Sequence, residues 1–133
     1  MRGYTLVELL VALLIFTVGI LGLWKMHLST INANSYSQYL NEASSLAEQQ
    51  MEMLRATAAQ NFNSSSLNAG NYNDTSLISN RYRREWEITD NPNGISNTKQ
   101  ITVSVGWGGN NCATDVNNCQ HIVTITSFVT NLQ

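Results

Sequence analysis

Apolar residues are concentrated at the start of the chain and follow no stripe there. From Tyr4 to Trp24 the single charged residue is Glu8. As a helix, these residues would reach roughly 31 Å at ~1.5 Å per residue, which is about the thickness of a bilayer core. The pattern therefore predicts a helix that is apolar on all sides and lies in lipid or inside a helix bundle.

The helical pattern continues beyond Trp24 but narrows to one face. Between Lys25 and Arg55 there is no glycine or proline. Apolar and small residues recur there at spacings close to three or four residues, or to a multiple of these: Leu28, Ile31, Tyr36, Leu40, Ala43, Ala47 and Leu54. Three further residues widen this apolar stripe: Tyr39, Leu46 and Met53. The pattern predicts one helix from about Tyr4 to about Ala56, whose second half packs against a folded head.

The second half of the chain changes to short alternating segments. Residues 57–80 are rich in Asn, Ser, Ala and Gly without a period, which predicts a long surface connection. Three segments then alternate with a period of two, and turn residues at 90–94 and 108–111 separate them. Their apolar positions are Tyr82, Trp86 and Ile88, then Ile101, Val103, Val105 and Trp107, then Val123, Ile125 and Val129. With the helix as cover, we predict an α+β fold, one helix across a three- or four-stranded antiparallel sheet.

The composition and the two cysteines bear on where the protein is located and what it binds. Charged residues make up 12% of the chain and the formal net charge is −2, which gives no reason to expect nucleic-acid binding. Cys112 and Cys119 have no third cysteine and no histidine pair nearby that would complete a zinc site. Downstream of a membrane segment, so close a pair is interpreted as a disulfide that closes a loop, with two free thiols as the alternative.

The N-terminal segment admits several interpretations. A secretory signal peptide would use Arg2 as its basic region, but the apolar segment is long and no small-x-small cleavage site follows Trp24. A plain membrane anchor leaves Glu8 unexplained, because an acid in an apolar span costs free energy and usually has a function. The local alternative for Glu8 is an interfacial acid near a helix N-terminus, stabilised by the helix dipole and water.

Residues 3–12, with the sequence Gly-Tyr-Thr-Leu-Val-Glu-Leu-Leu-Val-Ala, resemble the class III leader junction of type IV pilins and pseudopilins. The resemblance implies that a prepilin peptidase of the inner membrane cuts after Gly3 and N-methylates Tyr4. It also implies that Glu8, the fifth mature residue, serves filament assembly. In an apolar filament core the new α-amine of Tyr4 needs a counter-charge, which Glu8 of a neighbouring subunit can supply.

Beyond the junction, the chain is similar to PilV-type minor pilins. The similarity rests on residues 19–23, on the striped helix and on segments of the three late strands. Many major type IVa pilins carry a helix-kinking proline about where Lys25 stands, and its absence favours a minor subunit. We therefore expect a minor type IV pilin that is incorporated into pili or primes their assembly. The alternatives are a minor pseudopilin of a type II secretion system and a signal-anchored periplasmic binding domain that never polymerises.

This interpretation divides the chain into five parts. They are a leader at 1–3, a transmembrane and filament-core helix half at 4–25, an amphipathic helix half at 26–56, a connection at 57–80 and a sheet head at 81–133. The expected partners are other pilins through the N-terminal helix, the prepilin peptidase and, before assembly, the inner membrane. The expected location is a single pass of the inner membrane with a periplasmic head, and then the extracellular pilus.

Catalytic and metal-binding patterns are missing from the sequence. No nucleophile–base pair and no phosphate loop occur, so we expect no enzyme activity and no cofactor. His27 and His121 lack a ligand cluster and are interpreted as solvated or packed side chains. Asp90 and Asp115, each beside asparagines, lack the carboxylate count of good calcium loops and are interpreted as turn residues.

The remaining large side chains fit a folded head. Alternation places Trp86 and Trp107 on the inward face of their strands, where they are expected to be core residues. The arginines at the start of the first of these strands, followed by two glutamates, are interpreted as a solvated and self-paired strand face: Arg81, Arg83 and Arg84.

Overall fold

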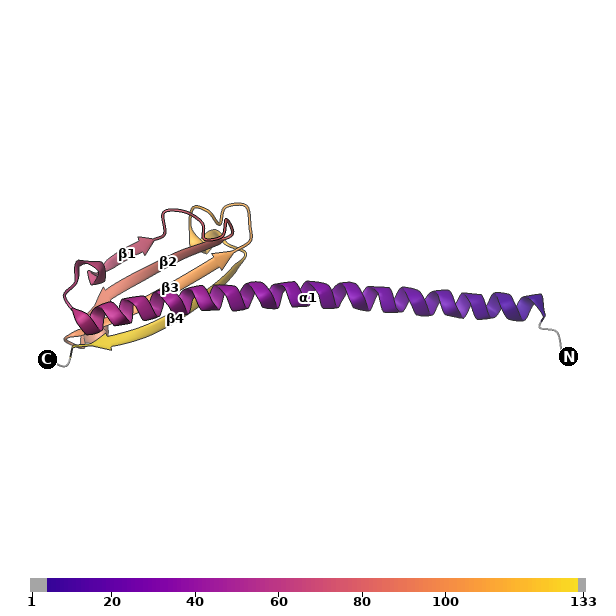
Figure 1. The fold of residues 1–133 in the computed structure, drawn as a ribbon, viewed down its shortest axis with the longest axis horizontal. Helices are drawn as coiled ribbons and strands as arrows, with labels where there is room; N and C mark the ends of the chain where they lie inside the picture. The colour runs from indigo at the N-terminus through magenta and orange to yellow at the C-terminus, as the bar shows by residue number, and fades with distance from the viewer. Residues whose placement is uncertain (1–4, 132–133) are drawn as a thin grey trace. The chain divides into compact units, whose positions relative to one another are not determined.

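The computed structural model describes residues 5–131, apart from the side chains of residues 28, 29 and 31–33. One helix, α1 (Leu6–Gln60), precedes a four-stranded antiparallel sheet in the order β1-β2-β3-β4. The strands are β1 (Gly70–Asn73), β2 (Tyr82–Asp90), β3 (Thr98–Trp107) and β4 (His121–Thr130). The chain divides into two compact units between Tyr39 and Leu40, inside α1. In the second unit, the C-terminal part of α1 lies along one face of the sheet (Figure 1), which confirms the predicted α+β fold.

Helix α1 extends beyond its predicted end at Ala56. Its last turn is held by packing and by local hydrogen bonds. Ala58 is buried in the core, and the hydroxyl of Thr57 donates to the carbonyl of Met53 at 2.9 Å. Just past the helix, the N–H of Asn61 donates to the carbonyl of Thr57 at 2.8 Å. The connection to the sheet therefore begins later than the sequence pattern indicated.

The core lies between the C-terminal part of α1 and the inward face of β2 and β3. The sheet contributes Tyr82, Ile88, Ile101, Val103, Val105 and Trp107, and the helix contributes Ala43, Ala47, Met51, Leu54 and Ala58. Three of the five helix residues are alanine, which lets the helix backbone approach the large side chains of the sheet closely. The period-two alternation predicted for β3 is thereby confirmed.

Part of the predicted helix stripe is exposed in the structure. Met53 is 57% exposed and Tyr36 is 45% exposed, so both predictions of packed positions are wrong. Met53 directly precedes Leu54, and one step in a helix turns the side chain by about 100°, which moves it off the buried face. The side chains of Leu28 and Ile31 lie outside the described residues.

The segment at 57–80 holds more structure than the predicted connection. A 3-10 helix, η1 (Ser65–Leu67), inserts the fully buried Leu67 into the core. Strand β1 follows and pairs with β2, and the ring of Tyr72 stacks on Trp86 at 5.9 Å between ring centroids. The hydroxyl of Tyr72 donates to the carbonyl of Asn68 at 2.9 Å. The sheet therefore gains its fourth strand from a segment that the sequence predicted to be a surface connection.

Both predicted turns are present. Between β2 and β3, η2 (Pro92–Gly94) follows Asn91, which has a left-handed backbone conformation with φ 49°. Asparagine tolerates this region better than most residues, which explains its use at the turn. Between β3 and β4, Gly108 and Gly109 have φ of 74° and 89°, and they open the connection that contains both cysteines.

Candidate functional site

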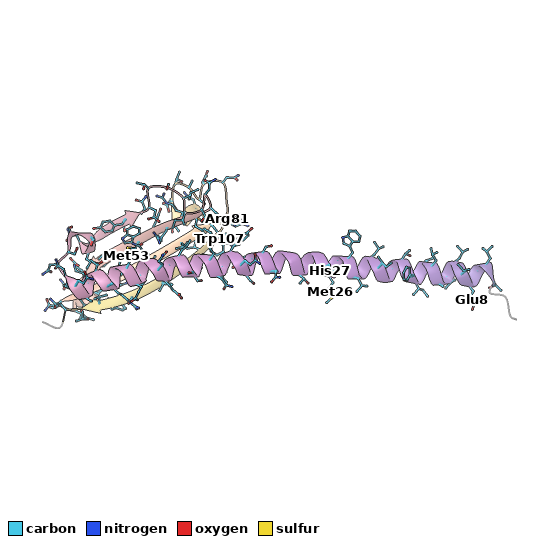
Figure 2. The ribbon with its side chains drawn as sticks, viewed as in Figure 1. Glu8, Met26, His27, Met53, Arg81 and Trp107 are labelled. Atoms are coloured by element: carbon cyan, nitrogen blue, oxygen red, sulfur yellow. A yellow bond between two sulfur atoms is a disulfide. The ribbon has the colours of Figure 1, made fainter. Side chains whose placement is uncertain are left out.

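Glu8 lies in the first turn of α1 (Figure 2). Thr5 stands just before the helix. Its carbonyl accepts a hydrogen bond from the N–H of Glu8 at 3.0 Å, and its hydroxyl accepts from the same group at 3.4 Å. Threonine followed three residues later by glutamate is a capping-box sequence, and an acid in the first helical turn interacts favourably with the helix dipole. The local role considered for Glu8 therefore has a structural basis.

From Leu9 to Trp24, α1 has no charged side chain and is exposed on all sides (Figure 2). Its segment Leu6–His27 is long and apolar enough to cross a membrane, by length and composition. Leu6, Leu21 and Met26 are 77%, 70% and 72% exposed. The hydroxyl of Thr17 donates to the carbonyl of Leu14 at 2.8 Å, so this polar group needs no water. Such a surface requires lipid or other protein chains around it.

Residues 1–24 match the family model of the prokaryotic N-terminal methylation motif. The match includes Gly3, Tyr4 and Glu8 and most of the apolar segment, and the sheet lies outside it. The motif indicates a prepilin of the type IV pilin or pseudopilin kind, and it implies processing by a prepilin peptidase. No curated protein and no solved structure matches the chain.

The family model supports the resemblance to pilin leader junctions but does not address the similarity to PilV-type minor pilins. The resemblance to the pilin-like leader junction is confirmed, whereas the similarity to PilV-type minor pilins rests mostly on residues beyond the match, which ends at Trp24. The residues predicted for cleavage and methylation, Gly3 and Tyr4, lie outside the described residues. The described part of the chain begins directly after Tyr4, with a capped helix start that carries Glu8.

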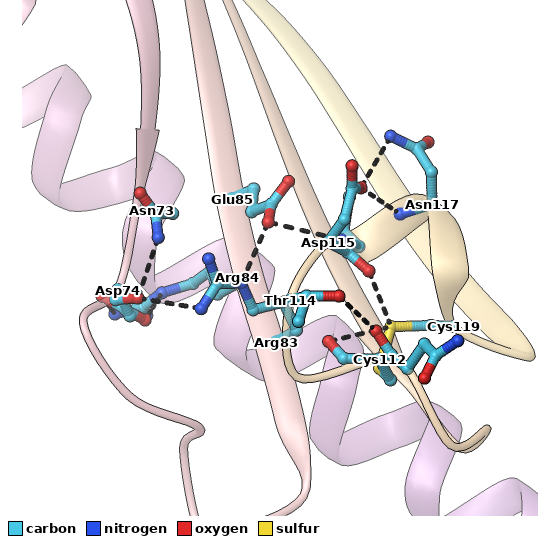
Figure 3. A network of polar contacts seen from close by, with 12 residues as sticks. Asn73, Asp74, Arg83, Arg84, Glu85, Cys112, Thr114, Asp115, Asn117 and Cys119 are labelled. Atoms are coloured by element: carbon cyan, nitrogen blue, oxygen red, sulfur yellow. Dashed lines mark hydrogen bonds and ion pairs between the residues drawn. A yellow bond between two sulfur atoms is a disulfide. The ribbon is translucent and has the colours of Figure 1, made fainter.

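A disulfide joins Cys112 and Cys119 and closes the connection between β3 and β4. Inside this loop lies η3 (Val116–Asn118), whose Val116 is buried. The carboxylate of Asp115 accepts a hydrogen bond from the N–H of Asn117 at 2.7 Å and thereby caps η3 (Figure 3). Asp115 thus serves the loop itself.

The disulfide loop packs onto the outer face of the sheet at Gly106. A Cβ atom at this position would lie 2.5 Å from Sγ and 2.7 Å from Cβ of Cys119, and 3.0 Å from Cγ2 of Val116. Real Cβ atoms do not approach other atoms so closely. Gly106 is therefore required by the close approach of the loop, and its backbone conformation is one that other residues adopt.

We expect Gly106→Ala to lift the disulfide loop and to destabilise the head by about 1–3 kcal/mol, the range typical of overpacking. Thermal unfolding of the full-length protein in detergent, followed by the β-sheet circular dichroism signal, measures the loss. Gly22→Ala is the matched control, because nothing lies within 4 Å of the added methyl group. A Gly106→Ala protein that unfolds at the same temperature as the control would show that the loop does not pack against β3.

The arginines at the start of β2 are integrated into the fold (Figure 3). Arg83 is 8% exposed and donates to the carboxylate of Glu85 at 2.9 Å, and the N–H of Val116 donates to the same carboxylate at 3.3 Å. Arg84 donates to the carboxylate of Asp74 at 2.9 and 3.3 Å. The expected pairing with Glu85 is present, but the expected solvation is wrong for Arg83 and Arg84, whose side chains are 10% and 13% exposed. The disulfide loop packs close to Arg83, and Arg84 also donates to the carbonyl of Leu46 in α1.

Tyr82 links the core to a charged side chain of α1. It is fully buried, and its hydroxyl donates to the carboxylate of Glu42 at 2.7 Å. Burial, and then the hydrogen bond and negative charge of Glu42, raise the pKa of Tyr82 to about 12. The phenol therefore stays protonated far above the ordinary range of tyrosine.

The pKa of Tyr82 is about 12 in the folded protein and about 10 in the unfolded chain, so the protonated phenol favours the folded state. The stabilisation that results is complete below pH 10 and declines as the pH rises toward 12. We expect the free energy of unfolding to fall there by at most about 1.4 kcal/mol per pH unit. Denaturant unfolding of wild type and Tyr82→Phe across pH 8–12 isolates this contribution. The same pH dependence in both proteins would contradict it.

The other candidate residues serve the fold. Trp107 is buried as predicted, whereas Trp86 is half-buried in its stack on β1. His121 is half-buried with its ring centroid 5.3 Å from that of Trp107, and His27 is exposed. Asp90 forms an ion pair with a lysine of β3. Within residues 5–131, no group of three or more His, Cys, Asp or Glu residues is placed to hold a metal ion.

Proposed function

We propose that this chain is a minor type IV pilin of the PilV type, a subunit that is incorporated into pili or primes their assembly. The observation that carries the proposal is the methylation motif at residues 1–24, with a glycine, an aromatic residue and Glu8 in register. The exposed apolar surface of Leu6–His27 supports it, because such a surface suits both a membrane before assembly and a bundle of pilin helices afterwards.

The proposed route of the protein follows from this assignment. The chain first spans the inner membrane once, with its sheet in the periplasm. The prepilin peptidase removes residues 1–3 and methylates Tyr4, and α1 then packs against the helices of other pilins. A structural role of this kind needs no catalytic residues and no cofactor.

Two features support a minor subunit. The apolar helix lacks proline near Lys25, where the resemblance leads us to expect one in many major pilins. The late strands are similar to the head of PilV-type proteins. A minor pseudopilin of a type II secretion system remains the second candidate, because the same motif begins such proteins. A periplasmic binding domain held by an uncleaved anchor is the third.

The mature N-terminus in surface filaments tests the proposal. We expect mass spectrometry of pili sheared from cells that produce the protein to find a small amount of chain beginning with N-methylated Tyr4. Processed chain in the membrane fraction but never in sheared pili, together with loss of secretion on gene deletion, would favour the pseudopilin. A chain that retains Met1 would favour the uncleaved anchor.

A further inference from the structure

Strand β4 forms one edge of the sheet (Figure 1). Its strand partner among the described residues is β3, and no strand of that part of the chain lies beyond it. A free strand edge presents a row of backbone N–H and C=O groups that can pair with another extended chain. At ten residues, β4 offers a longer edge than β1, which has four.

The register identifies which backbone groups of β4 face outward. In an antiparallel pair, hydrogen-bonded and non-hydrogen-bonded residue pairs alternate. The N–H of Asn131 donates to the carbonyl of Asn97 at 2.8 Å, in register with the last pair of β3 and β4. Odd-numbered residues of β4 therefore bond to β3. The residues whose N–H and C=O groups point away from the sheet are Ile122, Thr124, Thr126, Phe128 and Thr130.

This edge lacks the features by which proteins usually block strand pairing. Sheet edges are commonly protected by charged residues, proline or a bulge. From His121 to Thr130, β4 contains no Asp, Glu, Lys, Arg or Pro, and its pairing with β3 runs without interruption. Ile122 and Phe128 are 43% and 56% exposed. The side chains of β4 are thus compatible with a neighbouring strand of β-branched residues.

A groove between α1 and β4 runs beside this edge, with a volume of about 730 Å³. It is lined by Ser45, Glu48, Gln49, Met51, Glu52, Arg55 and Ile125. Arg55 is already engaged, because its guanidinium donates to the hydroxyl of Ser127 at 2.7 and 3.1 Å and lies 3.7 Å from Glu52. Glu48 and Glu52 are exposed one turn apart, so the helix side of the groove carries excess negative charge.

We propose that the edge of β4 docks an extended segment of another polypeptide, one with alternating β-branched residues and at least one Lys or Arg. The outward backbone groups pair with the backbone of this segment, and its cation meets Glu48 and Glu52. The unpaired backbone determines that the partner is a strand, and the charge of the groove determines the sign of its side chain. The proposal does not depend on the proposed role in pili.

A synthetic peptide tests the pairing. The probe is a fluorescent eight-residue peptide that alternates valine with threonine and lysine, titrated with the full-length protein in detergent and followed by anisotropy. We expect saturable binding, and at least about tenfold weaker binding after N-methylation of the amides along one peptide edge. A peptide with glutamate in place of lysine should bind about fivefold more weakly.

Protein variants locate the site. Thr126→Pro removes an outward N–H and leaves the backbone hydrogen bonds to β3, and we expect it to weaken binding at least about tenfold. Thr126→Ala keeps that N–H and should bind like wild type. If Thr126→Pro lacks the native circular dichroism spectrum, Glu48→Gln with Glu52→Gln replaces it and should abolish the preference for the lysine peptide.

Three results would overturn the proposal. They are the absence of peptide binding up to millimolar concentration, equal binding of the N-methylated peptide, and undiminished binding by a folded Thr126→Pro protein. Self-association of the peptide-free chain that Thr126→Pro abolishes would assign the edge to a second copy and would also overturn the proposed partner.

Discussion

A Gly3→Ile chain is expected to remain uncut, with all three leader residues retained on the membrane-inserted protein. The methylation motif implies a prepilin peptidase, and we propose that this enzyme requires glycine before the cut, as the resemblance to pilin leader junctions implies. An isoleucine there adds a branched side chain where the enzyme must approach the backbone, and it also removes the conformational freedom of glycine. Intact-mass measurement of the protein extracted from membranes distinguishes the two forms by the mass of the leader.

Gly3→Ala is the matched variant for this experiment, because a single methyl group should reduce processing less than isoleucine does. Both precursors should insert into the membrane, since the apolar segment begins beyond residue 3. Cleavage of Gly3→Ile before Tyr4 at the wild-type level would show that the cut does not depend on Gly3. The leader would then have to be recognised through other residues.

The helix and three of the strands could be predicted because each has its own period. The 3.6-residue stripe of α1 and the two-residue alternation of β3 depend on neighbours in the sequence. Strand β1 has four residues and one large side chain, Tyr72, so its alternation is too short to be recognised in the sequence. It is held by pairing with β2 and by the stack of Tyr72 on Trp86, and both depend on residues distant in the sequence.

Contacts between residues far apart in the sequence also explain why the roles of several polar residues were not predicted. The burial of Arg83 depends on the disulfide loop, which joins the fold through Val116 and Gly106. The roles of Asp74 and Glu42 could not be predicted, because their partners lie on other elements. The disulfide pair lies close together in the sequence, and the cysteine spacing indicated it directly.

In the candidate site, the local signals were the informative ones. The register of Gly3, Tyr4 and Glu8 is a short pattern, and the family model matches the segment that contains it. The hydrogen bonds of Thr5 were missed, although threonine three residues before a glutamate at the start of an apolar run is a sequence signal for a cap. The carboxylate of Glu8 also lies in the first turn of α1, where the helix dipole stabilises it, and any test of the proposed filament pairing must separate the two effects.

Glu8→Gln is expected to be made, inserted and cut, yet to be depleted from sheared pili by at least about a hundredfold. Near one end of the span, water and headgroups reach the carboxylate, so its insertion cost lies below the ~2.5–3.5 kcal/mol for acids at a helix centre. In the filament core that we propose, it would depend on the amine of Tyr4 from another subunit. Removing one member of a buried ion pair typically costs about 3–5 kcal/mol. Quantitative immunoblotting of sheared and membrane fractions measures the depletion.

Glutamine is the informative replacement because Thr5 accepts its hydrogen bonds from the backbone N–H of residue 8, so the helix start is retained while the charge is lost. Thr5→Ala makes the opposite change, since it removes the hydroxyl of the cap and keeps the carboxylate. If Glu8 acts through its charge, Thr5→Ala enters pili and Glu8→Gln does not. If Glu8 serves only the helix start, the order is reversed, because loss of a cap residue costs about 1 kcal/mol and the glutamine variant loses little. Incorporation of Glu8→Gln at the wild-type level would therefore leave Glu8 with its local role at the start of α1.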